Sequence, residues 1–173
     1  MNFSGPQARN CNLPPYLLYN VTDGAESVSG SSLCNKVEAA LVAKLVARVR
    51  DLKRKANVSV ITFYAKQRAL VQDHLAKAGM PNVPVKTVDG FQGSESDFVV
   101  ISCVRTDLHS IGFLSETERL NVALTRARYG CYVVGSFSRL TSNDMWRSLA
   151  DDAGNRKCMR VVSSRAGKEM MLP

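Results

Sequence analysis

The sequence contains few of the residues from which metal sites and disulfide frameworks are built. Its 173 residues include two histidines, His74 and His109, and five widely spaced cysteines with no C-x-x-C pair. Structural zinc sites need closely spaced Cys and His ligands, and disulfide frameworks use an even number of cysteines. We therefore expect no bound metal, no disulfide framework and an intracellular setting, in the nucleus or the cytoplasm.

Long apolar runs and leader-like segments are also missing. No apolar stretch approaches the roughly 20 residues that span a bilayer, and the first residues lack the basic end and apolar stretch of a signal peptide. The apolar fraction of 45% and charged fraction of 22% are ordinary for a globular protein, which excludes a disordered chain or a coiled coil. We expect no membrane partner and a single domain with three parts, namely an irregular lead-in over 1–35, an α/β core over 36–165 and a tail over 166–173.

Positive charge is in excess. The chain has 23 Lys and Arg residues against 15 Asp and Glu residues, which gives a formal net charge of +8. That balance favours an anionic partner such as a nucleic acid or the phosphates of a nucleotide. A contribution to solubility alone is the alternative explanation.

Helical and strand patterns alternate from residue 36 onward. Apolar residues at spacings of three and four predict a helix over 36–55, with Asn35 as its cap and Glu38 completing a capping box. Further strands are predicted over 58–64, 83–88, 98–104, 131–135 and 159–162, and further helices over 65–78, 116–127 and 140–152. This order predicts an α/β fold with a mostly parallel sheet and helices on both faces. In such sheets the functional loops follow the carboxyl ends of the strands.

The first 35 residues lack this periodicity. They are rich in Asn, Pro, Gly and Ser, and they contain one apolar stretch over 16–21 that predicts a short or edge strand. Residues 27–32 predict a loop. The lead-in is therefore expected to be irregular.

The loop after Val88 gathers glycines beside hydrogen-bonding side chains. It runs Asp89-Gly90-Phe91-Gln92-Gly93-Ser94-Glu95. Glycines let the backbone approach a ligand closely, and Gln92 and Glu95 supply polar groups next to them. The pattern fits a turn that contacts a nucleotide, or a polar loop with no ligand.

A second segment, over 119–128, combines an apolar helical face with arginines. Arg119 and Arg126 lie seven positions apart and are predicted to share a helix face. Arginine is always charged and grips phosphate with two hydrogen bonds. Pairing with nearby acidic residues is the alternative. Phe91 and Phe113, in the flanking segments, are expected in the core.

Together these segments resemble superfamily 1 helicases. Residues 87–105 are similar to motif V of that family and its extension, and residues 111–130 are similar to motif VI. Residues 60–67 resemble motif IV, in which Thr62, Tyr64 and Gln67 match and Phe63 stands where proline is usual. Over residues 14–160 the chain most resembles the branch that contains the nonsense-mediated-decay helicase and senataxin.

The resemblance implies the second, carboxyl-terminal RecA-like domain of an ATP-dependent RNA or DNA helicase. In that family ATP lies between two such lobes, and one nucleic acid strand crosses both. By this resemblance Arg126 is the catalytic arginine finger, which stabilises charge on the transferred γ-phosphoryl group. The implied nucleotide-binding residues are Gln92, Gly93, Glu95 and Arg126. The implied nucleic-acid-binding residues are Thr62, Tyr64, Thr87 and Val88. The implied partners are single-stranded RNA or DNA and the N-terminal RecA-like lobe of the same parent chain, in a monomer.

Two motifs of the complete motor are missing from the sequence. We find no P-loop of the form G-x-x-x-x-G-K-[ST] and no apolar strand that ends in Asp-Glu. These groups hold ATP with Mg²⁺ in P-loop motors. We therefore expect ATP and Mg²⁺ to be held mainly by the N-terminal lobe, and this chain alone to be inactive as one part of a longer enzyme.

Three other functions stay open at this point. The chain could be a stand-alone nucleic-acid-binding module that has lost the motor. It could be an interaction fragment in which the helix over 36–55, with its basic run at 53–55, docks an acidic partner. It could also belong to a helicase–nuclease fusion. RNA and DNA present the same phosphates, so both remain candidate strands.

Overall fold

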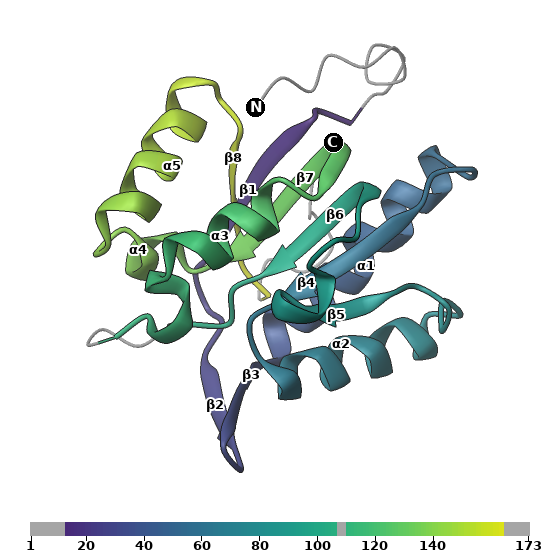
Figure 1. Cartoon of the computed structure of the whole chain (residues 1–173), viewed down its shortest axis with the longest axis horizontal. Helices are drawn as coiled ribbons and strands as arrows, with labels where there is room; N and C mark the ends of the chain where they lie inside the picture. Colours follow the sequence, from purple (N-terminus) through teal and green to yellow (C-terminus); the bar gives the residue numbers. More distant parts are fainter. Residues whose placement is uncertain (1–12, 107–109, 165–173) are drawn as a thin grey trace.

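The computed structural model describes residues 13–106 and 110–164. Within these residues six strands form one parallel sheet in the order β5-β4-β6-β7-β1-β8 (Figure 1). The strands are β1 Tyr16–Val21, β4 Val58–Thr62, β5 Val85–Thr87, β6 Ser96–Ser102, β7 Ala127–Gly135 and β8 Met159–Val162. The predicted tail over 166–173, the start of the lead-in over 1–12 and His109 lie outside the described residues.

Helices cover both faces of the sheet. They are α1 Lys36–Leu52, α2 Ala65–Lys77, α3 Thr117–Leu124, α4 Phe137–Leu140 and α5 Asp144–Asn155, with short 3-10 helices η2 Asp89–Phe91 and η3 Gly112–Ser115. One core packs α1 and α2 against the sheet, and a second core packs α3, α4 and α5 against the other face. In β6, Phe98 and Val100 face the first core, while Val99 and Ile101 face the second, as the pleat requires. Burial on both faces explains why the central strands are continuously apolar.

The predicted fold class, a RecA-like α/β domain with a parallel sheet between helices, is therefore confirmed. Two of the helix predictions after α2 need correction. The helix predicted over 116–127 ends at Leu124, because Ala127 already pairs with Ser96 in the sheet. Arg126 therefore lies beyond the helix and shares no helix face with Arg119. The helix predicted over 140–152 begins instead at Asp144, because Leu140 is the last residue of the short α4 and the Asn143 side chain caps α5 by accepting hydrogen bonds from the backbone.

The lead-in is not irregular where the structure describes it. β1 lies between β7 and β8, so it is an interior strand and not an edge strand. The predicted loop over 27–32 is a hairpin, in which β2 (Glu26–Ser29) pairs with β3 (Ser32–Asn35) around Gly30. Gly30 has a φ of +63°, the left-handed conformation that tight hairpin turns need.

Helix α1 begins as predicted and ends earlier than predicted. The Asn35 side chain accepts a hydrogen bond from the Glu38 backbone N–H at 3.1 Å, so the cap is confirmed. The capping box is wrong, because the Asn35 N–H donates to the side chain of Gln67 at 2.8 Å. The helix stops at Leu52, and the basic residues at 53–55 lie in the turn before β4, not on a helix face.

Candidate functional site

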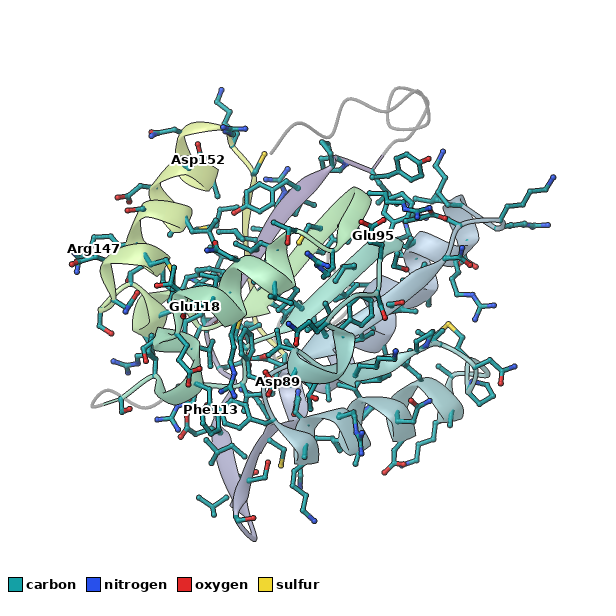
Figure 2. All side chains as sticks on the ribbon, viewed as in Figure 1. Asp89, Glu95, Phe113, Glu118, Arg147 and Asp152 are labelled. Atoms are coloured by element: carbon teal, nitrogen blue, oxygen red, sulfur yellow. The ribbon has the colours of Figure 1, made fainter. Side chains whose placement is uncertain are left out.

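The predicted site residues lie at opposite ends of the sheet. Because all six strands run in one direction, their carboxyl ends share one edge and their amino ends share the other. At or just beyond the carboxyl ends of β4 and β5 lie Thr62, Tyr64, Thr87 and Val88. Just before the amino ends of β6 and β7 lie Gly93, Glu95 and Arg126. Figure 2 shows Phe113 and Asp89 toward the first edge and Glu95 at the second. The loops that follow the strands thus carry only one of the two predicted sets.

At the amino edge, Arg126 folds back onto the end of α3. Its Nε donates a hydrogen bond to the carbonyl oxygen of Val122 at 3.1 Å, and its Nη2 donates to Oγ1 of Thr125 at 3.1 Å. Carbonyls at a helix end lack partners and attract cations, so this position suits a guanidinium. The backbone carbonyl of Arg126 accepts from the Ser96 N–H at 3.0 Å. The structure thus brings the segments of Glu95 and Arg126 together.

Glu95 and Gly93 are open to solvent beside this segment. A carboxylate oxygen of Glu95 lies 3.1 Å from Nε of Arg128, and both side chains are more than half exposed. Gly93 has a φ of +76°, and a Cβ at that position would meet nothing within 4 Å. Its backbone is therefore open to close approach by a ligand.

Gln92 lies between the two edges, directly after η2. Its side chain is exposed and, with Val88, Arg119 and Val122, lines a hollow of ≈ 140 Å³. Unlike the other predicted site residues, Gln92 therefore lies beside the segments that connect the two edges and not at an end of the strands.

At the carboxyl edge most of the predicted side chains are buried. Thr62 is fully buried, and its hydroxyl donates to the Ser102 carbonyl at 3.0 Å. Val88 is buried, and its N–H donates to the Thr62 carbonyl at 2.9 Å. Tyr64 is 5% exposed, and burial raises the pKa of its hydroxyl to about 12 against the opposing charge of Arg105. Thr87 is half-buried, and its Oγ1 accepts from the Gly90 N–H at 3.4 Å.

A cluster of contacts beside this edge contains the acidic pairing of Arg119 that the sequence left open as the alternative. Arg119 bonds Asp89 through two nitrogens at 3.1 and 3.2 Å, and Glu116 through a third at 3.1 Å. Its guanidinium carbon lies 4.8 Å from the ring centre of Phe113. Phe113 was expected in the core, but it is 49% exposed, whereas Phe91 is buried as expected. The sequence carried little signal for the exposure of Phe113, since a single Phe is expected to be buried whatever residues surround it.

A buried polar network lies next to the carboxyl edge. Glu38 is fully buried, and one carboxylate oxygen accepts from the Ser102 hydroxyl at 2.7 Å and from the Val104 N–H at 2.9 Å. Gln67 donates to the Ser102 hydroxyl at 2.9 Å and to the Asn35 carbonyl at 3.2 Å. Burial raises the pKa of Glu38 to about 7, and the hydrogen bonds from Val104 and Ser102 oppose that rise.

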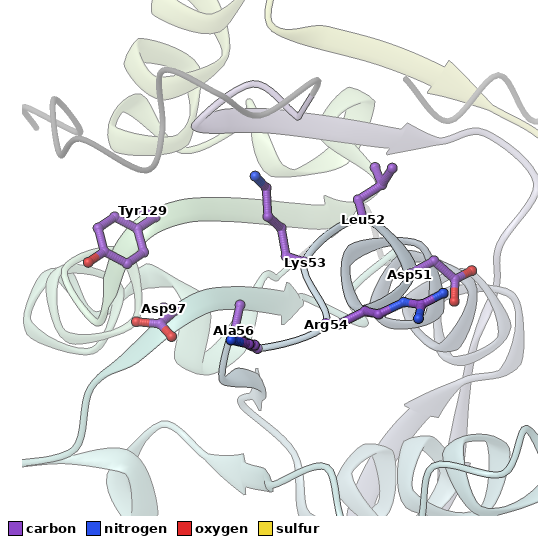
Figure 3. A pocket seen from close by; sticks show the side chains of 8 residues that line it. Asp51, Leu52, Lys53, Arg54, Ala56, Asp97 and Tyr129 are labelled. Carbon is purple, nitrogen blue, oxygen red and sulfur yellow. The ribbon is translucent and has the colours of Figure 1, made fainter.

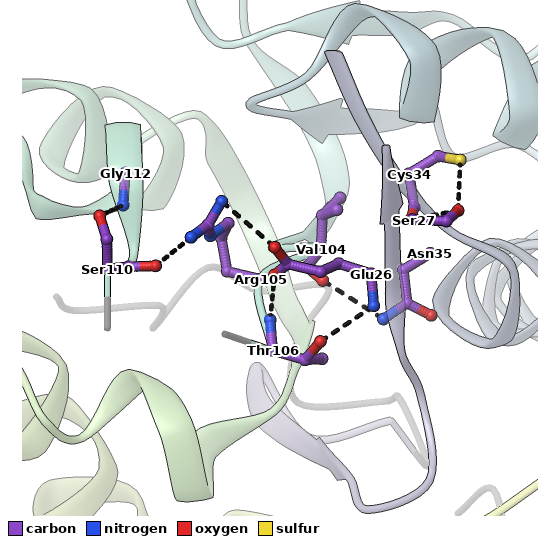
Figure 4. A network of polar contacts seen from close by, with 9 residues as sticks. All are labelled: Glu26, Ser27, Cys34, Asn35, Val104, Arg105, Thr106, Ser110 and Gly112. Carbon is purple, nitrogen blue, oxygen red and sulfur yellow. Dashed lines mark hydrogen bonds and ion pairs between the residues drawn. The ribbon is translucent and has the colours of Figure 1, made fainter. Parts of the chain in front are cut away.

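The segment after β6 is held in an unusual conformation by this network. Val104 has a φ of +73°, which is costly for a β-branched residue. Its carbonyl accepts from the Asn35 side chain at 3.3 Å (Figure 4). The next residues are tied to the hairpin, because Glu26 pairs with Arg105 at 3.3 Å and accepts from the Thr106 N–H at 2.6 Å. Hairpin, α1 and the end of β6 therefore form one connected unit.

The basic turn after α1 lines a hollow at the amino edge. Lys53 and Arg54 lie around a space of ≈ 470 Å³ together with Tyr129 and the carboxylates of Asp51 and Asp97 (Figure 3). Asp97 accepts from the Asn57 N–H at 2.9 Å. Charges of both signs thus face this hollow.

The described residues contain neither a cluster of metal-ligating side chains nor a membrane-spanning helix. Over 13–106 and 110–164, no group of three or more His, Cys, Asp or Glu side chains is arranged to hold a metal ion. No helix in the same part of the chain is long and apolar enough to cross a membrane.

Comparison with known proteins identifies similar sequences. A family model described as an AAA domain matches residues 4–138. The chain is 37% identical over 166 residues to "Regulator of nonsense transcripts 1" of Dictyostelium discoideum, covering 91% of this chain and 12% of that protein. It is 37% identical over 149 residues to human "Probable helicase senataxin", covering 82% of this chain and 6% of that protein. It is 40% identical over 122 residues to "Helicase sen1" of Schizosaccharomyces pombe, covering 68% of this chain and 7% of that protein. The chain therefore spans a small part of each relative.

Proposed function

Because this chain belongs to the AAA domain family, as the second RecA-like domain of a superfamily 1 helicase of the nonsense-mediated-decay helicase and senataxin branch, we propose that it is the carboxyl-terminal lobe of an ATP-driven motor on RNA or DNA. The motor acts as an intracellular monomer, in the nucleus or the cytoplasm. An N-terminal RecA-like lobe of the same parent completes it and holds most of the ATP and Mg²⁺. Two of the three relatives described above, human senataxin and sen1 of Schizosaccharomyces pombe, are named as helicases, and this supports the proposal.

The amino edge contributes the nucleotide contacts. Arg126 is the arginine finger and stabilises the charge that develops on the γ-phosphoryl group. Its present bonds, to Val122 and Thr125, are made at a half-exposed position, so exchanging them for a phosphate costs little. Gly93 offers an open backbone and Glu95 an exposed polar side chain at this edge, and Gln92 offers its exposed side chain from the connecting segment, toward the phosphates and ribose.

The carboxyl edge contributes the strand contacts. Thr87 is the one residue of its set whose side chain reaches solvent, so its hydroxyl is suited to hold a phosphate. Thr62, Tyr64 and Val88 are buried and act by fixing the strand ends on which Thr87 lies.

The observation that carries the proposal is the separation of these two sets. A nucleotide and a strand can bind at opposite edges at the same time, and the segments from η2 to Gly93 and from η3 to Arg126 run from one edge toward the other. Closure of two lobes on ATP can therefore alter the grip on the strand through these segments.

A chimaera tests the proposal. This chain replaces the matching segment of the Dictyostelium relative, and strand-stimulated ATP hydrolysis is measured. We expect hydrolysis, and we expect Arg126→Ala to lower kcat by on the order of 10³-fold. Arg147→Ala is the matched control, because Arg147 lies on α5 and, within the part of the chain that the structure describes, bonds Asp144 and the Thr141 carbonyl.

The isolated chain provides the complementary test. We expect it to hydrolyse ATP negligibly, so robust strand-stimulated turnover by the pure chain would contradict the proposal. A chimaera that binds strands but does not hydrolyse ATP would favour a stand-alone binding module instead.

A further inference from the structure

Phe113 places an exposed aromatic ring near the carboxyl edge. Among the described residues, the exposed large apolar side chains are Val28 at 78%, Phe113 at 49% and Val161 at 70%. Phe113 is the aromatic member of this set. It lies in η3, which follows the end of β6 and precedes α3, and Figure 2 shows it in the same region as Asp89.

The ring is held in position from two sides. The Arg119 guanidinium lies over one face of the ring, 4.8 Å from its centre, and the Tyr64 ring lies 5.9 Å away at an angle of 43°, so a ligand can stack only on the part of the ring that stays exposed. Arg119 is itself fixed by Asp89 and Glu116. A ring that is ordered before a ligand arrives loses little conformational entropy when it binds one.

The charges around the ring favour one kind of ligand group. Asp89 and Glu116 both reach solvent, with side chains 66% and 46% exposed. Their carboxylates repel phosphate, and they already neutralise the charge of Arg119. The surroundings of Phe113 therefore suit a flat and uncharged group rather than the phosphate backbone.

We propose that Phe113 is a stacking platform for an unpaired nucleobase of the bound strand. The inference rests on the proposed function, because it requires a strand at the carboxyl edge. Stacking is tolerant of sequence, since every base presents a π face, and it serves RNA and DNA alike.

The test compares two strands of equal charge. Binding of the 173-residue chain to a fluorescent single strand of uniform sequence, and to the same strand built from abasic nucleotides, is measured at low salt by anisotropy. We expect the base-bearing strand to bind about tenfold more tightly. Phe113→Leu keeps the apolar bulk but removes the π face, so it should abolish this preference, whereas Phe113→Trp should keep it.

Controls separate the platform from the strand site. Val161→Ala alters an exposed apolar side chain on β8 and should leave both affinities unchanged. The slope of affinity against salt reports phosphate contacts and should be the same in Phe113→Leu as in the unaltered chain. Thermal melting checks that each variant is folded.

The outcomes are distinct. If the unaltered chain binds neither strand, the proposed strand site and the platform both fail. If it binds both strands equally, or if folded Phe113→Leu keeps the tenfold preference, the platform fails and the strand site stands.

Discussion

Asp89 and Arg119 join η2 to α3 through a two-pronged ion pair, with Oδ1–Nε and Oδ2–Nη2 distances of 3.1 and 3.2 Å. Both segments run between the two edges at which the nucleotide and the strand are proposed to bind. The pair therefore keeps these two segments in a fixed relation, and Arg119 extends that relation to the ring of Phe113.

This ion pair is expected to contribute modestly to stability. A double-mutant cycle with Asp89→Ala and Arg119→Ala should give a coupling free energy of about 0.5–1 kcal/mol, because the pair is partly solvated. Urea unfolding measures it. The more exposed pair of Arg147 and Asp144 is the control and should couple less strongly. A coupling above about 2 kcal/mol would mean that the Asp89 pair behaves as a buried one.

Glu38 should make stability depend on pH. Burial raises its pKa from 4.5 to about 7 in the folded chain, so folding takes up a proton between those values. The contribution to the free energy of unfolding is then complete below about pH 4.5 and is lost as the pH rises through about 7. Glu38→Gln mimics the neutral acid and should flatten this dependence, as measured by urea unfolding from about pH 5 to 8.

The control for that prediction is Glu118→Gln, at an exposed position on α3. It should leave the pH dependence as it is in the unaltered chain. A slope of the same size in Glu38→Gln would assign the effect to another group.

Two glycines should respond to alanine in opposite directions. A Cβ at Gly130 would lie 2.5 Å from Cδ1 of the buried Phe98 ring, so Gly130→Ala should destabilise the fold. A cost of about 1–3 kcal/mol is typical of overpacking. At Gly154, on α5, a Cβ meets nothing within 4 Å, so Gly154→Ala should stabilise by about 0.5–1 kcal/mol. Thermal and urea unfolding of both variants check the two signs.

The buried cysteines should resist thiol reagents while the chain is folded. Burial raises the pKa of Cys131 to about 12 and that of Cys103 well above its usual value. Among the cysteines that the structure describes, Cys34 and Cys158 are half-buried and should react before Cys103 and Cys131. Alkylation at neutral pH followed by peptide mass spectrometry gives the order. Labelling of Cys103 before Cys34 would contradict the packing of the second core.

The alternating core of the fold was predictable because its signals are local. Apolar runs such as 98–104 identify buried strands, and the spacing of apolar residues over 36–52 identifies a helix. The interior position of β1 was not predicted, because its apolar run is short and both of its neighbouring strands lie far along the chain. The early end of α3 could not be predicted locally either, since it depends on the pairing of Ala127 with Ser96 in the sheet.

The site was only partly predictable for a related reason. The motif residues were found by resemblance, but their exposure depends on tertiary packing, which buries Thr62 and Tyr64 and leaves Phe113 open. Glu38 followed the local capping pattern in sequence. Its carboxylate instead accepts from the Val104 N–H, 66 positions away, which a local pattern cannot predict.

The place of β1 in the sheet has a consequence for how the chain is made. Tyr16 pairs with Cys131 and Leu18 pairs with Met159, so β1 must wait for two strands that are synthesised much later. Pairings between distant segments slow folding and leave strand edges open in the meantime. During translation, Leu17 and Leu18 therefore stay uncovered until β7 has left the ribosome. This interval is when a nascent chain most needs a chaperone or a folded neighbouring domain.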